Sequence, residues 1–178
     1  MKTLMNLILM FAAITSSACV EVPPRKIAPE LEEWVVRFEQ KYNTEVNYPV
    51  TFADDTELGH FEGLCEVTGG VSRIVIDKSF YEETQDNTHN GDLAMEMLLF
   101  HELGHCSFDL EHDNEWLPIE SDDGTIQSAS YMHGDSPVSS YEVMGQDYYQ
   151  TELGKRIQCK KDIARGNMKS SACLYSLK

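Results

Sequence analysis

The sequence predicts an α+β fold with a small mixed sheet, on two observations. Hydrophobic patterns of helical and strand-like period follow one another in the order helix, strands, helix, long irregular stretch, helix. The length of 178 residues, with 42% apolar and 25% charged residues, suits one soluble domain with a single hydrophobic core. No internal repeat or low-complexity segment interrupts that order.

The domain is predicted to span residues 30–178 and to begin with a helix. Leu31, Trp34, Val35 and Phe38 fall at positions i, i+3, i+4 and i+7, with charged residues between them. This spacing places the four apolar side chains on one face of a helix. We expect that face to pack in the core.

Three short strands are expected next. Residues 48–53 are rich in β-branched and aromatic side chains, which favour a strand. Residues 63–68 and 71–80 flank Gly69-Gly70, and this pattern is typical of two strands joined by a tight turn.

The second half of the chain is predicted to hold two helices. Residues 82–91 are polar and predict no regular element, whereas the apolar run that follows Asp92 predicts a long helix. After it the chain is expected to be irregular through about residue 140, because it contains Pro118, Gly124, Gly134 and Pro137. A C-terminal helix is predicted over residues 146–157, where three apolar residues are spaced by four: Tyr149, Leu153 and Ile157.

Residues 1–18 have the features of a secretory signal peptide, and residues 19–29 those of a short proline-containing tether. The apolar run at 7–14 is too short for a permanent membrane span, and small residues lead directly to Cys19. This ending resembles the bacterial lipoprotein signal, in which the cysteine is lipidated; plain secretion with cleavage nearby is the alternative. Either way we expect an exported protein, as a membrane-anchored bacterial lipoprotein (periplasmic or at the cell surface) or as a secreted one.

The cysteine content fits export. With Cys19 used by the signal, four cysteines remain, an even number that indicates two disulfides in an oxidising compartment. Three pairings are formally possible. We predict that Cys159 bonds to Cys173, closing a short C-terminal loop, and that Cys65 bonds to Cys106, tying the long helix to the preceding strands.

The net charge of −16 limits the partners. Such an acidic chain repels nucleic acid and anionic lipid headgroups, so neither is expected to bind. Contact with a membrane is expected only through the lipid anchor at Cys19. We expect a monomer whose partner is a protein or peptide substrate.

The motif that carries chemistry is His101-Glu102-Leu103-Gly104-His105, at the end of the long predicted helix. Residues i and i+4 lie one above the other on a helix, so both imidazoles can reach one metal ion. Neutral imidazoles suit Zn²⁺, and Glu102 is placed to take a proton from a water that the metal activates.

A catalytic zinc site needs a third protein ligand, and His112 is the predicted one. A continuous helix would put His112 about 10 Å beyond His105, so the helix must end and the chain must turn back. Asp109, a residue type that tolerates the left-handed conformation, stands where that reversal is needed. The alternative is a thermolysin-like site in which a later glutamate, Glu120 or Glu142, is the third ligand.

These residues resemble the metzincin clan of zinc peptidases, whose pattern is HExxHxxGxxH followed by a methionine-containing turn beneath the metal. The string HELGHC with a later histidine also resembles a group of small bacterial lipoproteins that are themselves metzincin-like. Two departures from the clan pattern are visible: the third histidine comes one residue later, and Asp109 stands roughly where the glycine belongs.

The resemblance implies a metzincin-like zinc metallopeptidase, most simply a metalloendopeptidase, that hydrolyses peptide bonds with Glu102 as general base. It implies Met132, or failing that Met144, in the methionine turn, and an edge strand near Ile74 and Ile76 that pairs with an extended substrate. A non-catalytic zinc-binding surface lipoprotein is the remaining alternative. Two further sets receive no catalytic role: the tyrosines Tyr141, Tyr148 and Tyr149, and the histidines His60, His89 and His133, which are predicted to be at the surface.

Overall fold

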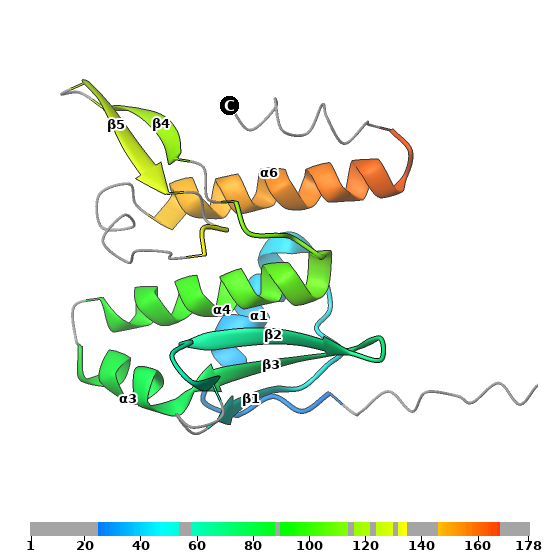
Figure 1. The fold of residues 1–178 in the computed structure, drawn as a ribbon, viewed down its shortest axis with the longest axis vertical. Helices are drawn as coiled ribbons and strands as arrows, with labels where there is room; N and C mark the ends of the chain where they lie inside the picture. The colour runs from blue at the N-terminus through cyan, green and yellow to red at the C-terminus, as the bar shows by residue number, and fades with distance from the viewer. Residues whose placement is uncertain are drawn as a thin grey trace, which may run out of the picture.

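The chain builds a three-stranded mixed sheet that α-helices cover, together with a separate two-stranded hairpin (Figure 1). A computed structural model describes residues 25–53, 58–87, 90–113, 116–121, 124–129, 132–134 and 146–167. Its elements in order are α1 (Glu32–Tyr42), β1 (Val50–Ala53), β2 (Gly63–Thr68), β3 (Val71–Asp77), α3 (Lys78–Asp86), α4 (Gly91–Phe108), β4 (Trp116–Ser121), β5 (Gly124–Ala129) and α6 (Gln146–Ala164). The predicted α+β class is confirmed.

The strand β3 lies in the middle of the sheet, parallel to β1 and antiparallel to β2. Ile74 and Ile76 are fully buried in the main core on one face, whereas Val75 packs with Ala53 and Leu58 on the other. Both faces of β3 are therefore covered, and β2 forms one edge of the sheet. The predicted edge role of the strand near Ile74 and Ile76 is wrong, because β3 has neighbours on both sides.

Helix α3 replaces the last part of the predicted third strand and most of the polar stretch after it. The strand ends at Asp77, whose carboxylate caps the helix by accepting hydrogen bonds from the Phe80 N–H and the Ser79 hydroxyl. The connection to α4 is tight, since a Cβ at Gly91 would lie 1.8 Å from the Thr84 carbonyl oxygen. Helix α3 was not predicted because a cap on Asp77, rather than a long apolar stripe, starts it.

Helix α1 confirms the first predicted element and supplies much of the core. Phe38 is fully buried, and its ring makes edge contacts with those of Tyr42 and Phe100 at centroid distances of 4.9 and 5.1 Å. The contact with Phe100 fixes α1 against α4, the helix that carries the histidine motif.

The last residues of the predicted tether belong to the packed domain. Ile27 forms a parallel bridge with Val50, and the Ala28 N–H donates to the Val50 carbonyl at 2.8 Å. Arg25 forms ion pairs with Glu32 and Glu39 of α1. Residues 25–29 thus extend the β1 edge rather than standing apart from the domain.

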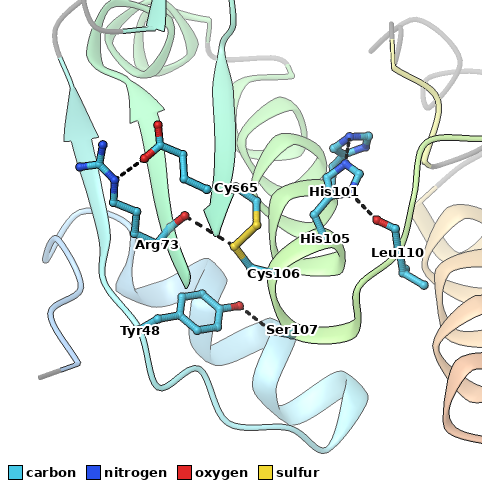
Figure 2. Close-up of a disulfide and its surroundings, with 9 residues drawn as sticks. Tyr48, Cys65, Arg73, His101, His105, Cys106, Ser107 and Leu110 are labelled. Carbon is cyan, nitrogen blue, oxygen red and sulfur yellow. Dashed lines mark hydrogen bonds and ion pairs between the residues drawn. A yellow bond between two sulfur atoms is a disulfide. The ribbon is translucent and has the colours of Figure 1, made fainter. Parts of the chain in front are cut away.

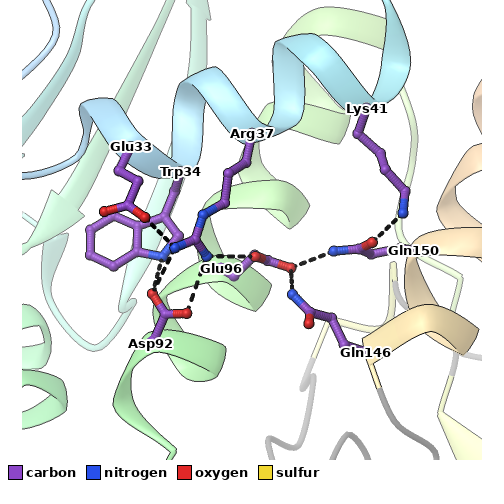
Figure 3. Close-up of polar contacts among 8 residues, drawn as sticks. All are labelled: Glu33, Trp34, Arg37, Lys41, Asp92, Glu96, Gln146 and Gln150. Carbon is purple, nitrogen blue, oxygen red and sulfur yellow. Dashed lines mark hydrogen bonds and ion pairs between the residues drawn. The ribbon is translucent and has the colours of Figure 1, made fainter.

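Helix α4 lies between the sheet and α6 (Figure 1), and a buried carboxylate joins it to two other helices. Glu96 of α4 is 1% exposed; it pairs with Arg37 of α1 at 3.1 Å and accepts hydrogen bonds from Gln146 and Gln150 of α6 (Figure 3). The same Arg37 also pairs with Asp92. This network fixes the orientation of α4 within the fold.

The hairpin of β4 and β5 corrects the prediction of an irregular stretch after His112. Its register pairs Ser121 with Gly124 and Pro118 with Gln127. Because hydrogen-bonded pairs alternate outward from the Ser121–Gly124 pair, Pro118 falls at a non-bonded position, where its missing N–H removes no ladder bond. Pro118 and Gly124 were expected to interrupt regular structure, whereas the hairpin register accommodates both.

The C-terminal helix α6 is confirmed and continues beyond its predicted end at residue 157. Cys159 on this helix is disulfide-bonded, and its predicted partner Cys173 lies outside the described residues. The predicted signal peptide and Cys19 lie outside them as well. No helix within the described ranges is both long and apolar enough to cross a membrane.

Candidate metal centre

The last two turns of α4 carry His101 and His105 on one face, as the motif predicts. Their Nε2 atoms lie 3.0 Å apart, and the two rings meet edge to face. His101 is buried, whereas His105 is half-buried. The two histidines therefore lie at the inner, buried end of the candidate site.

The chain reverses directly after α4 at Asp109, which adopts the left-handed conformation with φ of 51°. The Asp109 N–H donates to the His105 carbonyl at 3.0 Å, and the Leu110 N–H donates to the Gly104 carbonyl at 3.3 Å. The predicted reversal is confirmed.

That reversal brings the exposed His112 back over the helix. Its Nε2 lies 3.2 Å from the Nε2 of His101. Each of the three histidines offers one ring nitrogen within 4.8 Å of the others. The structure thus joins all three residues that the sequence analysis named as metal ligands.

The three-histidine cluster fits a tetrahedral metal ion. Two imidazole nitrogens at about 2.05 Å from Zn²⁺ lie roughly 3.3 Å apart at a tetrahedral angle, close to the 3.0 and 3.2 Å observed. His105 Nδ1 bonds to the Leu110 carbonyl oxygen, which assigns the proton to Nδ1 and leaves Nε2 unprotonated (Figure 2). Burial also lowers the pKa of His105, which favours the neutral form that a metal requires. The cluster can hold a metal ion.

Glu102 is buried beside the histidines, with 6% of its surface exposed. Burial raises its pKa to about 7, and a hydrogen bond from the Cys65 backbone opposes that rise. Strand β2 approaches closely here, because a Cβ at Gly63 would lie 3.2 Å from Glu102 Cγ. A carboxyl group whose pKa is near 7 can both accept and return a proton at neutral pH.

Met132 lies against α4 beneath the histidine pair. It is fully buried, and a Cβ at Gly104 would lie 3.2 Å from its sulfur. Its carbonyl oxygen accepts a hydrogen bond from Asp113 N–H at 2.8 Å, which links it to the segment that carries His112. The lack of a side chain at Gly104 therefore allows Met132 to pack closely against α4. Met144, the second candidate for this position, lies outside the described residues.

A cleft of about 710 Å³ opens over the histidines and follows β2. Phe61 and Val67 line it and are 53% and 64% exposed, and they are the large apolar side chains that are exposed among the described residues. His60 is exposed and His133 half-buried, and both line the cleft although no sequence motif placed them there. The cleft thus has the three histidines at its base and the apolar side chains of Phe61 and Val67 beside the edge of the sheet.

The open edge of the sheet, which the sequence analysis assigned to the wrong strand, is β2. The Asp77 N–H donates to the Glu62 carbonyl at 2.8 Å, which makes this a hydrogen-bonded pair. Bonded and non-bonded pairs alternate along an antiparallel ladder. The non-bonded residues of β2 therefore turn their N–H and C=O groups away from β3: Gly63, Cys65 and Val67.

A disulfide between Cys65 and Cys106 joins this edge to α4, as predicted (Figure 2). Cys106 directly follows His105, and Cys65 is the residue whose backbone bonds Glu102. The sequence offered two signals for this contact, the even cysteine count and the position of Cys106 beside the motif. It offered none for the hydrogen bond to Glu102.

The remaining candidates lie apart from the cluster or outside the described part of the chain. Glu111 is exposed beside His112 and is not among the clustered ligands. Tyr149 is 2% exposed and packs in the main core. Glu120 falls on β4 and Tyr148 on α6, where only the backbone is described; Glu142, Tyr141 and His89 lie outside the described residues.

No family model, curated protein or solved structure matches this chain. What can be said of the site therefore rests on its motif, its geometry and its chemistry.

Proposed function

We propose that the chain is a zinc-dependent peptidase, with His101, His105 and His112 as metal ligands and Glu102 as general base. The observation that carries the proposal is the convergence of three imidazole nitrogens beside a buried carboxyl group, inside a cleft that follows an open sheet edge. Three histidines leave one tetrahedral position open for water or substrate, as in catalytic zinc sites.

Zinc is the proposed metal because all three candidate ligands are imidazoles. Hard cations such as Mg²⁺ and Ca²⁺ prefer oxygen ligands, and the cluster offers none. When bound, the ion would supply Lewis-acid activation of a water molecule and of the scissile carbonyl group.

The protein's own groups account for the proton transfers. Glu102 would accept a proton from the attacking water and later pass it to the leaving amine. The Cys65 N–H interacts with the carboxylate from the side of β2, which favours its ionised form. The surrounding burial keeps the pKa of Glu102 near neutrality, which suits a group that must both take and give a proton.

The substrate is proposed to lie along β2 as an added strand. Gly63 and Val67 direct backbone groups to the open edge of the sheet, and both line the cleft. Main-chain hydrogen bonds to such an edge bind extended peptides with little regard to their sequence. This arrangement favours a peptide bond as the group that is hydrolysed.

A metzincin-like architecture is the form of zinc peptidase that we propose. In support, the third histidine follows a left-handed reversal at Asp109, and Met132 lies buried beneath Gly104 of the metal helix. An antiparallel edge strand borders the cleft, as the resemblance implies. The longer spacing to His112 and the aspartate at position 109 are departures from the clan pattern.

The substitution Glu102→Gln tests the catalytic reading. Because only the base is removed, the variant should bind one equivalent of zinc while peptidase activity on casein or a peptide library falls at least a hundredfold. The wild-type protein should lose activity with a chelator and regain it with zinc. Wild-type turnover in the zinc-loaded variant would rule out Glu102 as the base, and inactivity of the zinc-loaded wild type would favour a non-catalytic zinc-binding protein.

The proposed place of action is outside the cytoplasm, with Cys19 as a lipid anchor. If so, Cys19→Ser should move the protein from the membrane fraction to the soluble fraction of expressing bacteria. A wild-type protein that is soluble and begins at another residue would instead indicate plain secretion.

A further inference from the structure

We propose that the Cys65–Cys106 disulfide is a positioning element for Glu102, so that full catalytic activity requires its oxidation. The inference rests on the proposed peptidase function. It follows from one juxtaposition: Cys65 donates its backbone N–H to the carboxylate of Glu102, and its side chain is bonded covalently to the residue after His105.

The N–H of Cys65 is available to Glu102 because of the sheet register. Cys65 is a non-bonded residue in the β2–β3 ladder, so its N–H points to the open edge rather than to β3. The group that it meets there is the carboxylate of α4. One backbone donor of the edge strand therefore serves the general base, and it does so only while β2 stays close to α4.

The contact between β2 and α4 is tight but is not held by backbone pairing. A Cβ at Gly63 would lie 3.0 Å from Leu98 Cδ1 and 3.2 Å from Glu102 Cγ, so the strand and the helix meet without a side chain between them. Among the strands that the structure describes, β2 has a hydrogen-bonded neighbour on one side only. The disulfide is a covalent link between β2 and α4 (Figure 2). One of its cysteines, Cys65, is the residue whose backbone contacts Glu102, and the other, Cys106, directly follows His105.

Formation of this link is a two-electron oxidation. The two thiols of Cys65 and Cys106 lose two protons and two electrons as the S–S bond forms, and a disulfide oxidant such as oxidised glutathione is reduced to two thiols. A chain in a reducing compartment would keep both thiols and a less restrained Glu102. The same chain in an oxidising compartment would acquire the positioned base.

The first experiment measures the positioning directly, without activity. Hydrogen exchange at the Cys65 amide should be at least tenfold slower in the wild type than in Cys65→Ala/Cys106→Ala, because the edge amide loses its fixed acceptor. The variant Glu102→Ala should also show faster hydrogen exchange at the Cys65 amide, although the Cys65–Cys106 disulfide is intact in that variant. Equal protection in the wild type and the double variant would overturn the proposal.

The second experiment measures the catalytic consequence. In Cys65→Ala/Cys106→Ala we expect zinc stoichiometry and KM within twofold of wild type but a kcat at least tenfold lower, because the base is misplaced while metal and substrate still bind. Wild type treated with a phosphine reductant should lose kcat to the same extent and recover it with oxidised glutathione, whereas the double variant should respond to neither.

The matched control removes the other predicted disulfide. The variant Cys159→Ala/Cys173→Ala should keep the wild-type kcat and should still lose it on reduction. Cys159 lies on α6, whereas the contacts of Glu102 named above come from β2. A full kcat in the Cys65/Cys106 double variant would overturn the proposal. A zinc-loaded wild type without peptidase activity would instead overturn the proposed function, and amide exchange would still decide whether the disulfide positions Glu102.

Discussion

Arg156 of α6 is buried and forms an ion pair with the half-buried Asp113, the residue that directly follows His112. Arg156 Nη2 and Asp113 Oδ2 lie 2.6 Å apart. The two groups form an ion pair, but their angles do not meet those of a hydrogen bond. The same guanidinium donates to Glu152 at 2.7 Å through Nε. The backbone of Asp113 in turn bonds to Met132. The segment that presents His112 is thus fixed by α6 and by the residue beneath the histidines.

We therefore predict that Asp113→Asn weakens zinc binding about tenfold, because His112 loses the support that orients it. Glu152→Gln is the matched control, since it removes the other carboxylate from the same arginine but does not touch the His112 segment. Isothermal titration calorimetry should find its zinc affinity within twofold of wild type. Equal losses in both variants would mean that Arg156 acts through overall stability alone.

His112→Ala should weaken zinc binding at least tenfold, because it removes one of three clustered ring nitrogens. Glu111→Ala, Glu120→Ala and Glu142→Ala should leave the zinc affinity within twofold. Competition with a chromogenic chelator measures all four variants. If one of the glutamate variants lost zinc while His112→Ala kept it, the site would be thermolysin-like.

The stability of the metal-free protein should depend on pH through Glu102. Its pKa in the folded protein, about 7, lies above the ordinary value of 4.5, so folding favours the neutral carboxyl group. The contribution of Glu102 to the free energy of unfolding is therefore fully present below about pH 4.5 and is lost as the pH rises to about 7. The difference between the two pKa values corresponds to a decrease of about 3 kcal/mol in that free energy.

Glu102→Gln, which cannot ionise, should accordingly be more stable than wild type at pH 7.5 and equally stable at pH 4.5. Urea unfolding of chelator-treated protein at several pH values measures the difference. Added zinc should reduce it, because a nearby cation favours the ionised carboxylate. A difference independent of pH would refute the link to ionisation.

The apolar wall of the cleft predicts a preference for substrates with apolar side chains. Phe61 and Val67 project into it from the region of the sheet edge and remain more than half exposed. For peptides with a large apolar residue beside the scissile bond, Phe61→Asn should lower kcat/KM about tenfold, and Val67→Thr by a smaller factor. The same variants should act within twofold of wild type on peptides with small polar residues. Equal losses on both peptide sets would argue against substrate contact.

The local elements that the sequence predicted well are those with a strong periodic or motif signal. The apolar spacing of α1, the Gly69-Gly70 turn between β2 and β3, and the start of α6 all follow from such patterns. The reversal at Asp109 was predicted because a metal ligand beyond it would otherwise be out of reach. By contrast, α3 begins at a cap on Asp77 and the β4–β5 hairpin contains a proline, and neither carries a clear periodic signal.

By itself, the sequence determined the helical pair His101 and His105 and the carboxylate of Glu102 between them, because these depend on spacing along one helix. It predicted His112 and the Cys65–Cys106 disulfide, each with an alternative left open, and the structure decided both. Only the tertiary structure decided which strand forms the open edge, because pairing order depends on how β1 and β2 both add to β3. It also decided the partners of Glu102 and Asp113. A backbone N–H from β2 and a guanidinium from α6 reach them through packing between segments far apart in the chain, for which a sequence pattern holds no signal.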